Sequence, residues 1–439
     1  MNLSPLARRG LRRLLAGAAL LLAGLPAIAQ ELSWSTYGTL GFARSDAAYT
    51  YQTHIDRNGT LSRDSVLGVQ GDVRFGPQWS ATAQLKLAPS AKHDSRWDLV
   101  PAWAFVAWRP NDDWLLRAGR LRLPMYLYSE SMDVGQTHDM VRLPTELYSV
   151  LPVPDFNGLS VGRSWTLGDE GQRELGIEAF GGATRSTARF WLSEGLAPVV
   201  PAGATYWPVK ARLAGLAITL RQPDLLVRAS LSRSALQRSG NEPFPSNYPW
   251  VPLGPGLGYY QVNDSLPGPG VPTVTTVHNS IGSLGAEIGL GQGWRVTVEA
   301  VRNVQHDSPF GVDATAGYVA VFKQIDRLTP YASLSTQRSR QGTRDWYARL
   351  TANPLPQAIP GAAQINAAQQ LAAEVFWPAE QHALAIGASY RLTPAVKLKG
   401  EWLHTRIGQV SHLVDTPAGS APPRDTGLNV LSVNLSFAF

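Results

Sequence analysis

The chain ends in Leu431-Ser-Val-Asn-Leu-Ser-Phe-Ala-Phe439, in which apolar side chains alternate with small or polar ones up to a terminal aromatic residue. Successive side chains of a β-strand point to opposite faces, so one face of this stretch is wholly apolar and the other accepts water. The pattern predicts an amphipathic strand. A soluble β-sandwich produces the same alternation, so the terminal strand alone does not distinguish the two contexts.

The N-terminus has the composition of a secretory signal peptide. Four arginines lie within residues 8–13, an apolar run covers residues 14–25, and Pro26-Ala-Ile-Ala29 places small residues before Gln30. The run is too short for a comfortable membrane span. We therefore predict that residues 1–29 form a cleaved signal peptide and that residues 30–439 form the mature protein. An uncleaved anchor is the alternative.

The charge and cysteine content exclude several classes of function. Removal of residues 1–29 takes away four of the 39 Lys and Arg residues and no acid, which leaves 35 bases against 33 acids. The mature protein is thus nearly neutral, and its high nominal pI does not indicate a nucleic-acid partner. The chain has no cysteine, which excludes disulfides, thiolate chemistry and a lipoprotein anchor. No cofactor is expected.

Alternating segments recur along the whole mature chain. Sixteen of them have strand length, an even number of the kind found in bacterial membrane barrels. The predicted strands cover residues 32–43, 65–75, 79–88, 99–108, 114–121, 159–167, 173–184, 211–221, 225–234, 279–290, 294–302, 315–325, 328–338, 383–391, 395–405 and 429–439.

The connections between these strands alternate in length. Short ones cover residues 76–78, 109–113, 168–172, 222–224, 291–293, 326–327 and 392–394. Long ones cover residues 44–64, 122–158, 185–210, 235–278, 339–382 and 406–428, with moderate ones at 89–98 and 303–314. An up-and-down membrane barrel has this arrangement, with periplasmic turns at one rim and extracellular loops at the other. We therefore predict an all-β, transmembrane antiparallel barrel, because only a closed sheet leaves no unpaired edge in lipid.

Aromatic residues gather beside the short connections. Trp79, Trp108, Trp114 and Trp294 flank predicted turns, and Phe439 ends the chain on the same side. Each tryptophan alone is as well explained by core packing, but their common position resembles an aromatic girdle at one membrane interface.

These features together resemble the sixteen-stranded porins of Gram-negative outer membranes over the whole mature length. Arg120-Leu-Arg-Leu-Pro124 is also similar to the strand-to-loop junction of phosphate-selective-type porins, a short match. The resemblance implies a water-filled channel for passive diffusion of small hydrophilic solutes. It implies that the long loop 122–158 folds into the lumen as a constriction.

The resemblance also implies partners. It implies a homotrimer in contact with the lipid bilayer and lipopolysaccharide, and a terminal strand, with Phe439, Phe437 and Leu435, that is read by the barrel-insertion machinery as an assembly signal. The expected location is the outer membrane.

The strand phases and the inward loop give a set of candidate pore residues. Those predicted to line the pore or its constriction are Arg117, Arg122, Glu130, Asp133, Asp139, Arg142, Glu146, Glu178, Arg228, Glu299 and Lys399. A basic ring at the periplasmic mouth is predicted from Arg74, Arg221, Arg295, Lys323 and Arg391, which lie next to short turns. Bases outnumber acids on the predicted lumen face, so the channel is expected to lean toward anions.

The acids of the inward loop are expected to face wall bases such as Arg117, which would set up a transverse field. Acids on a solvated loop are the alternative. Within the loop, residues 145–150 are predicted to form a helical turn, and residues 362–376 have helical spacing in another loop. Arg163 falls on the apolar face of its strand, and a bulge or a subunit contact would relieve the cost of placing it in lipid.

No enzyme is predicted. The His-Asp pairs at residues 93–94, 138–139 and 306–307 lack a third ligand at useful spacing and are interpreted as solvated loop residues. Neither a nucleophile elbow nor a phosphate-binding loop is present. Two alternatives stay open, a non-conducting barrel for adhesion or envelope assembly and a barrel hydrolase with a Ser-His pair at its rim.

Overall fold

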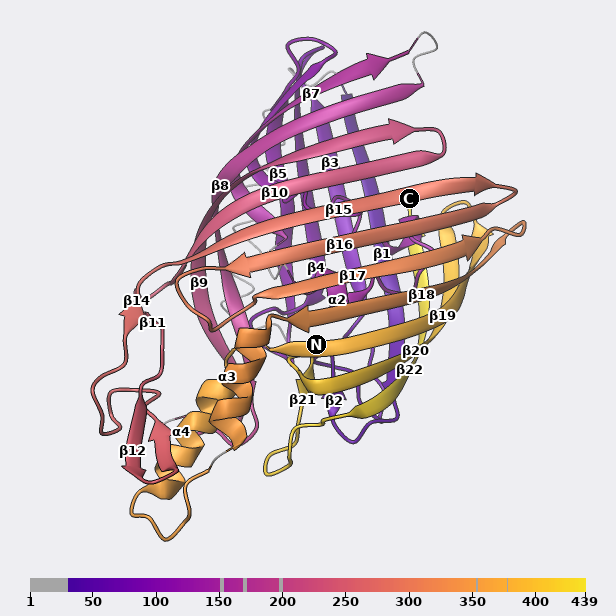
Figure 1. Ribbon diagram of the computed structural model, residues 1–439. Helices are drawn as coiled ribbons and strands as arrows, with labels where there is room; N and C mark the ends of the chain where they lie inside the picture. Colours follow the sequence, from indigo (N-terminus) through magenta and orange to yellow (C-terminus); the bar gives the residue numbers. More distant parts are fainter. Residues whose placement is uncertain (1–30, 151–153, 169–171, 197–199, 353, 377) are drawn as a thin grey trace, which may run out of the picture.

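The computed structural model describes residues 31–150, 154–168, 172–196, 200–352, 354–376 and 378–439. The predicted signal peptide lies outside the described residues. Sixteen strands form one closed antiparallel barrel (Figure 1), so the predicted fold class and strand number are confirmed. In barrel order they are β1 (Glu31–Ser45), β3 (Val66–Arg74), β4 (Trp79–Pro89), β5 (Trp97–Trp108), β6 (Trp114–Arg122), β7 (Asp155–Leu167), β8 (Arg173–Leu192), β9 (Gly203–Gln222), β10 (Leu225–Arg238), β15 (Val277–Gly291), β16 (Trp294–Gln305), β17 (Ala314–Lys323), β18 (Leu328–Ser339), β19 (Ala379–Thr393), β20 (Val396–Ser411) and β22 (Thr426–Ala438).

The terminal strand closes the barrel. β22 pairs with β20 on one side and with β1 on the other, in a register that joins Leu40 to Leu435 and Gly38 to Phe437. Past the end of β22, the backbone of Phe439 exchanges two hydrogen bonds with Thr36, each 2.8 Å long. The first and last strands of the chain therefore close the barrel.

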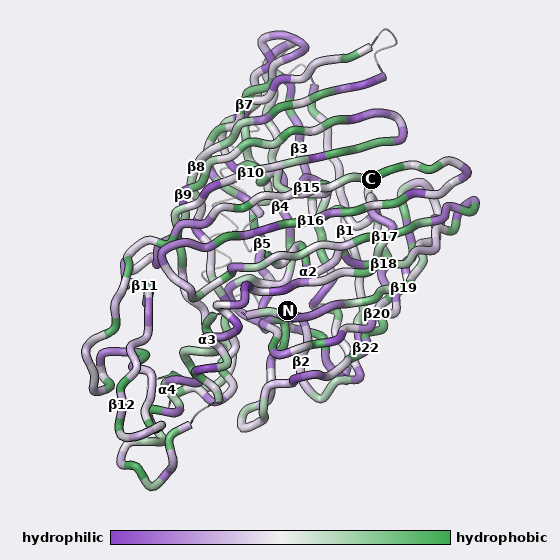
Figure 2. Tube along the Cα trace, viewed as in Figure 1, coloured by the Kyte–Doolittle hydropathy of each residue, from purple (hydrophilic) through white to green (hydrophobic). Residues whose placement is uncertain are grey.

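The outward side chains form an apolar surface. Leu431 is 62% exposed and Leu40 is 58% exposed, while the alternate positions Ser432 and Ser436 are buried toward the lumen. Along the barrel strands in Figure 2 apolar and polar residues alternate. Exposure of apolar surface to water is unfavourable by about 25 cal/mol per Å². This outward surface is therefore suited to contact with lipid. Among the described residues, no helix has the length and hydropathy needed to cross a membrane.

An aromatic cluster lies at the short-turn end of the barrel. The rings of Trp79 and Trp108, on adjacent strands, stack with their centroids 5.7 Å apart, and both residues are exposed. Trp294 is 45% exposed beside the short turn between β15 and β16. These positions fit the predicted interfacial girdle.

The hairpin of β8 and β9 is longer than predicted. Its ladder runs without interruption to the pair Leu192 and Gly203, so only residues 193–202 lie outside the two strands. The expected loop 185–210 is therefore wrong at both ends. The alternation of apolar residues reports contact with lipid, and it ends where the hairpin rises above the membrane although the backbone pairing continues.

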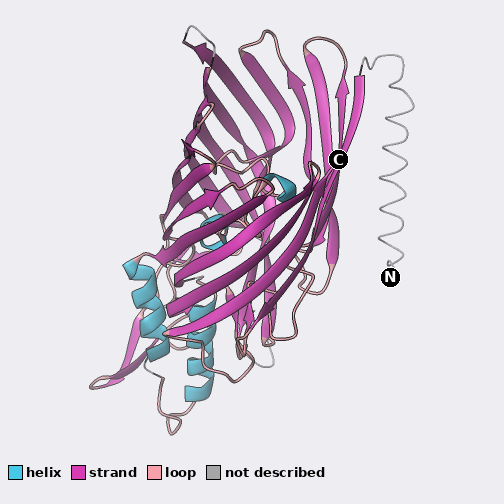
Figure 3. Ribbon diagram, turned by 90° about the vertical axis from the view of Figure 1, so that its right-hand side faces the viewer, coloured by secondary structure: helices cyan, strands magenta, loops and turns pink. Residues whose placement is uncertain are grey.

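The long-loop end carries its own small structures. The loop after β10 contains two hairpins, β11 (Phe244–Pro245) with β14 (Thr273–Val274) and β12 (Trp250–Gly254) with β13 (Leu257–Tyr260). The loop after β18 contains helices α3 (Gln341–Ala352) and α4 (Ala362–Glu374), of which only the second was predicted. β2 (Thr50–Tyr51) pairs with β21 (Val414–Asp415). Figure 3 shows α3 and α4 together at this end of the barrel.

Candidate pore and lumen segment

The described part of the connection between β6 and β7 lies inside the barrel, and we call residues 123–150 the lumen segment. Its backbone bonds to strands on the far wall. Leu127 N donates to Glu299 Oε1 (2.8 Å), and Asn434 Nδ2 donates to Val141 O (3.0 Å). In Figure 3 two short helical turns lie within the barrel; these are η1 (Gly135–Thr137) and α2 (Thr145–Tyr148). Residues 155–158 belong to β7, so the expected boundary at residue 158 is wrong by four residues.

Apolar packing holds both ends of the lumen segment. Leu123 and Met125 at its start and Leu147 and Val150 near its end are buried against the wall residue Phe180. The sequence at 145–150 begins a helical turn, as predicted, and α2 places Leu147 on the buried side. Removal of this apolar surface from water is the main reason for the segment to fold inward.

The carboxylate of Asp133 joins the segment to two strands. Lys86 of β4 lies 2.8 Å from it, and Arg122 at the end of β6 lies 2.5 Å from it. Arg122 also lies 3.1 Å from Asp155 at the start of β7. Both cations are largely buried, so each depends on these carboxylates for compensation.

Asp139 likewise joins the lumen segment to two strands, on the opposite wall of the barrel. Arg295 of β16 lies 2.6 Å from its carboxylate and Lys397 of β20 lies 2.9 Å from it. The hydroxyl of Ser389 donates a third bond at 2.8 Å. His138, next to it, is buried with its ring against Tyr128. The interpretation of this His-Asp pair as solvated is therefore wrong.

Three further predicted residues hold the segment through its backbone or through a loop. Lys399 is 2% exposed and donates to Gly135 O (2.5 Å) and Met140 O (3.0 Å). Arg228 donates to Tyr126 O and pairs with Glu130, both at 2.8 Å. Arg142 pairs with Asp64 of the first long loop at 2.5 Å.

Glu299 and Glu146 are buried acceptors. Glu299 accepts the hydroxyls of Tyr148 and Tyr318, each at 2.9 Å, besides the bond from the segment backbone. Glu146 accepts bonds from Ser335 and Gln381, each 2.8 Å long. In these described contacts the two carboxylates meet hydroxyl, amide and backbone donors instead of cations.

Arg117 does not face an acid of the lumen segment. Its guanidinium bonds Glu178 on the wall, and its Nε donates to Ser160 between them. The prediction that acids of the loop face Arg117 across the lumen is therefore wrong, because Arg117 pairs with Glu178 of the wall. The segment acids Glu130, Asp133 and Asp139 are bonded directly to wall bases, because burial favours contact between opposite charges over separation.

The predicted basic ring is only partly formed. Arg74, Arg221 and Arg391 lie at the short-turn rim on lumen-facing positions, whereas Arg295 is bonded to the lumen segment. Lys323 is on the outer face, contrary to the prediction. It pairs in register with Trp294 and lies 4.9 Å from the centroid of that ring, because the inward positions of β17 are the even-numbered ones.

Arg163 is on the outer face near the same rim. β7 pairs with both neighbours without a register shift, which excludes a bulge among the described pairs. Its guanidinium lies 5.3 Å from the Trp114 ring and 4.9 Å from the Trp165 ring. Cation–π contacts beside an interface reduce the cost of a charge near lipid. A subunit contact at this site stays a prediction.

Polar cavities lie on both sides of the lumen segment. One of about 600 Å³ lies on the long-loop side, between the segment, the first long loop and residues Thr187 and Arg189 of β8. Two more, of about 360 Å³ and about 220 Å³, lie on the short-turn side. The larger of these is lined by Arg327, Arg391 and Lys397.

Several residues of the upper polar cavity had no signal in the sequence. Arg189 of β8 lies 2.7 Å from Asp94 and 2.6 Å from Asp415, which belong to different loops. Burial raises the pKa of Asp94, but hydrogen bonds from Arg189 and Tyr206 outweigh it and hold that pKa below its ordinary value. Long-range loop contacts of this kind have no periodicity to reveal them.

Among the described residues, no group of three or more His, Cys, Asp or Glu side chains is placed to hold a metal ion. Two Ser-His contacts lie at the long-loop end, where Ser280 Oγ is 3.2 Å from His306 Nε2 and Ser95 Oγ is 3.3 Å from Nδ1 of His93, two residues away in the chain. The neighbouring Asp307 bonds His278 instead, at 2.7 Å. The geometry therefore gives a serine and a histidine without the acid that would orient the imidazole.

No protein-family model and no curated protein matches the chain. Solved structures of outer-membrane proteins resemble it. OmpT of Vibrio cholerae is 11% identical over 93% of this chain and 98% of its own, with a TM-score of 0.49. The channel DcaP of Acinetobacter baumannii is 12% identical (93% and 97% covered, TM-score 0.48). Salmonella typhi OmpF, solved with daunomycin, is 10% identical (94% and 99% covered, TM-score 0.48).

Resemblance at this level carries no information on solutes or activity, and none of it bears on a phosphate-selective subtype. The fold rests on the strand order itself. The chain is a closed, sixteen-stranded antiparallel β-barrel, the architecture of outer-membrane porins, with one connection folded into its lumen.

Proposed function

We propose that the protein is an outer-membrane channel for passive diffusion of small hydrophilic solutes. The observation that carries this proposal is the presence of polar cavities on both sides of a lumen segment that is fixed to the wall by ion pairs. A barrel filled only for stability would gain more from apolar packing than from buried charge pairs. Charged walls beside a narrow segment are what a selective aqueous path requires.

A preference for anions is part of the proposal. The upper cavity is lined by four Lys or Arg residues and three carboxylates, namely Arg63, Arg142, Arg189 and Lys399 against Asp64, Asp94 and Asp133. The larger lower cavity has three bases, Arg327, Arg391 and Lys397, against Asp139 alone. An excess of positive charge at both ends raises the local concentration of anions.

Recording from the purified protein in planar bilayers tests the proposal. The expected result is a steady conductance with a reversal potential, under a KCl gradient, on the side of chloride. A conducting channel with a cation-selective reversal potential would remove the anion preference and keep the pore. Absence of conductance in protein whose unboiled gel mobility shows a folded barrel would overturn the pore.

Absence of conductance in the folded protein would favour the alternative of a non-conducting barrel. The structured long-loop end, with α3, α4 and the β12–β13 hairpin, provides a surface that an adhesion or assembly protein would need. The hydrolase alternative depends on Ser280 and His306, and ester hydrolysis abolished by Ser280→Ala would support it. We propose that the protein is not an enzyme, since His306 lacks an orienting acid among the described residues.

The homotrimer, the contact with lipopolysaccharide and recognition by the insertion machinery are also proposals. The mass of the detergent-solubilised protein, measured by light scattering with the detergent contribution subtracted, distinguishes a trimer from a monomer. Cleavage of the signal peptide after Ala29 is testable by N-terminal sequencing of the protein recovered from the outer membrane.

A further inference from the structure

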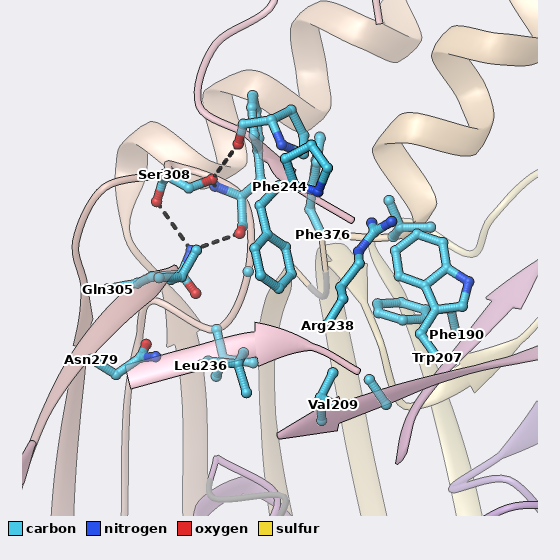
Figure 4. A pocket seen from close by; sticks show the side chains of 18 of the residues that line it. Phe190, Trp207, Val209, Leu236, Arg238, Phe244, Asn279, Gln305, Ser308 and Phe376 are labelled. Atoms are coloured by element: carbon cyan, nitrogen blue, oxygen red, sulfur yellow. Dashed lines mark hydrogen bonds between the residues drawn. The ribbon is translucent and has the colours of Figure 1, made fainter. Parts of the chain in front are cut away.

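An apolar chamber of about 470 Å³ lies above the lumen segment, beside the polar cavity. Its wall comes from β8, β9, β10, β15 and β16, and its floor includes Leu123 and Val150 of the lumen segment. Its roof comes from the loops after β10 and β16, from α4 and from the residues directly after α4, as Figure 4 shows for Phe244 and Phe376. The chamber therefore lies within the extended part of the barrel and beneath the structured loops.

The β8 strand separates this chamber from the polar cavity. Ala188 and Phe190 line the apolar chamber, whereas Thr187 and Arg189 line the polar one. Alternate side chains of one strand thus face two compartments of opposite character. This arrangement gives the protein a second, apolar compartment that passage of hydrophilic solutes does not require.

Aromatic rings form much of the chamber lining. Phe190 packs against Trp207 with the ring centroids 4.5 Å apart, and Phe310 stacks on Phe376 at 4.2 Å. The roof's polar groups are used internally, since Gln305 Nε2 donates to Ser308 O (3.0 Å) and to Phe310 O (2.6 Å), as the dashed lines in Figure 4 show. Most of the remaining surface is apolar and fits a flat or aliphatic body, and the polar side chains that line the chamber include Arg238, Asn279 and Asn303.

One cation points into this apolar space. The guanidinium of Arg238 lies 4.1 Å from the Trp207 ring centroid and 5.3 Å from that of Phe244, and Figure 4 shows it beside the rings. Its Nε is buried and has no hydrogen-bond partner among the described residues. Glu242 is the acid that acts on it electrostatically, from beyond ion-pair range. Asp264, which also lines the chamber, is exposed and accepts the N–H of Val271.

A second buried polar atom lacks a partner. Asn303 is 4% exposed, its Nδ2 donates to Val312 O (2.7 Å), and its Oδ1 has no partner among the described residues. Asn303 lines the same chamber. Because Oδ1 is an acceptor, only a hydrogen-bond donor satisfies it, so this atom makes the lining more polar but does not select a carboxylate.

We propose that this chamber binds a small amphipathic anion, a carboxylate with an apolar body of one or two rings. The apolar body lies between Val209, Leu236 and the roof rings, and the carboxylate accepts a charge-assisted hydrogen bond from Arg238. A charged donor in an apolar site selects for the anionic head, because a neutral head would leave the guanidinium unpaired. The apolar lining supplies affinity and the guanidinium supplies selectivity.

Binding by the full-length barrel in lipid nanodiscs tests the proposal without competition from detergent. The probes are 2-naphthoate and its neutral amide, 2-naphthamide, each titrated calorimetrically. We expect 2-naphthoate to bind the unaltered protein and Arg238→Gln to weaken its binding about tenfold, as the loss of a charge-assisted bond predicts. Binding of 2-naphthamide should change by less than about twofold, because its head carries no charge.

Two further variants identify the site. Arg233→Gln removes an exposed arginine from the opposite face of β10 and should leave both affinities unchanged. Val209→Trp fills the chamber beside Arg238, with which Val209 pairs in register, and should abolish binding of both probes. Folding of each variant is verified from its unboiled gel mobility.

Three results would overturn the proposal. These are no binding of 2-naphthoate, equal loss of both probes in Arg238→Gln, or undiminished binding in folded Val209→Trp. The titration involves no current, so its failure leaves the proposed channel standing. Conversely, a barrel without conductance can still bind the probe.

Discussion

The ammonium group of Lys86 lies 2.8 Å from Oδ1 of Asp133, so that a strand of the barrel wall is bonded to the segment that crosses the lumen. Arg122 approaches the other carboxylate oxygen at 2.5 Å. One carboxylate therefore compensates two cations, of which the Arg122 side chain is only 3% exposed. The position of the lumen segment depends on this contact.

Asp133→Asn should destabilise the barrel and loosen the lumen segment. The substitution keeps the shape of the side chain and removes the charge, which leaves Lys86 uncompensated and Arg122 with Asp155 alone. Loss of one partner of a buried ion pair costs on the order of 3 kcal/mol. Urea unfolding should show this decrease, and single-channel records should show more current fluctuation than the unaltered protein.

Asp112→Asn is the matched control, because Asp112 is exposed in a short turn between β5 and β6. It should leave both the unfolding curve and the current noise unchanged. An Asp133→Asn barrel as stable as its parent would show that apolar packing alone holds the segment.

The basic residues of the lower cavity should set part of the ion preference. Arg327 and Arg391 are exposed there and are not bonded to the lumen segment in the described contacts, so their removal should not disturb its position. Arg327→Gln with Arg391→Gln should lower the anion-to-cation permeability ratio about twofold by weakening the local potential. Reversal potentials under a KCl gradient measure this ratio.

A single change on the outer face provides the control for that double variant. Arg406 is exposed on an outward position of β20, and Arg406→Gln should leave the reversal potential where it was. An equal shift in the control would mean that net charge, and not the position of the charge, decides the ion preference.

The barrel could be predicted from the sequence because the bilayer imposes a period. Lipid requires an apolar side chain at every second position, so strands such as Trp79–Pro89 are visible as alternation, and connection lengths reveal the two rims. The same reasoning misplaced the ends of β8 and β9, since the hairpin leaves lipid before it ends. Lys323 was misplaced because lysine on an outward rim position can extend to water.

The sequence predicted which charged residues enter the lumen, but it did not predict which residues they pair with. Charged residues in the connection after β6 indicated an inward loop, and the structure places Asp133 and Asp139 in the lumen. Which wall base each acid meets depends on the depth and rotation of the strands, which alternation does not determine. The sequence did not predict the apolar chamber, because residues from five strands and several connections meet there without any local pattern.

The closing seam of the barrel leaves no room for a side chain at Gly38. A Cβ atom at this position would lie 2.6 Å from Cζ of Phe437 on the paired strand. Gly38→Ala should therefore displace that ring and lower the free energy of unfolding by about 1–2 kcal/mol, the usual cost of overpacking. Thermal or urea unfolding of the folded barrel measures the change.

Gly400→Ala is the control for this glycine. Gly400 occupies an outward position on β20, and a Cβ atom there meets nothing within 4 Å. It should be as stable as the parent or slightly more stable, because alanine restricts the unfolded chain. Equal destabilisation of both variants would exclude the Phe437 contact as the cause.

Deletion of Phe439 should impair assembly in cells far more than it impairs the finished barrel. The residue lies past the end of β22, its side chain is 70% exposed, and it contributes two backbone hydrogen bonds to Thr36. Exposed backbone bonds at a strand end contribute about 1 kcal/mol each, so barrel refolded in vitro without Phe439 should retain its conductance and most of its stability. A role as a recognition signal predicts a much larger loss of outer-membrane protein in cells.

Quantification of folded barrel in outer-membrane fractions, beside refolding of the same variant in lipid vesicles, separates the two roles. Normal assembly in cells would remove the signal role, and failure to refold in vitro would make Phe439 a structural residue of the seam.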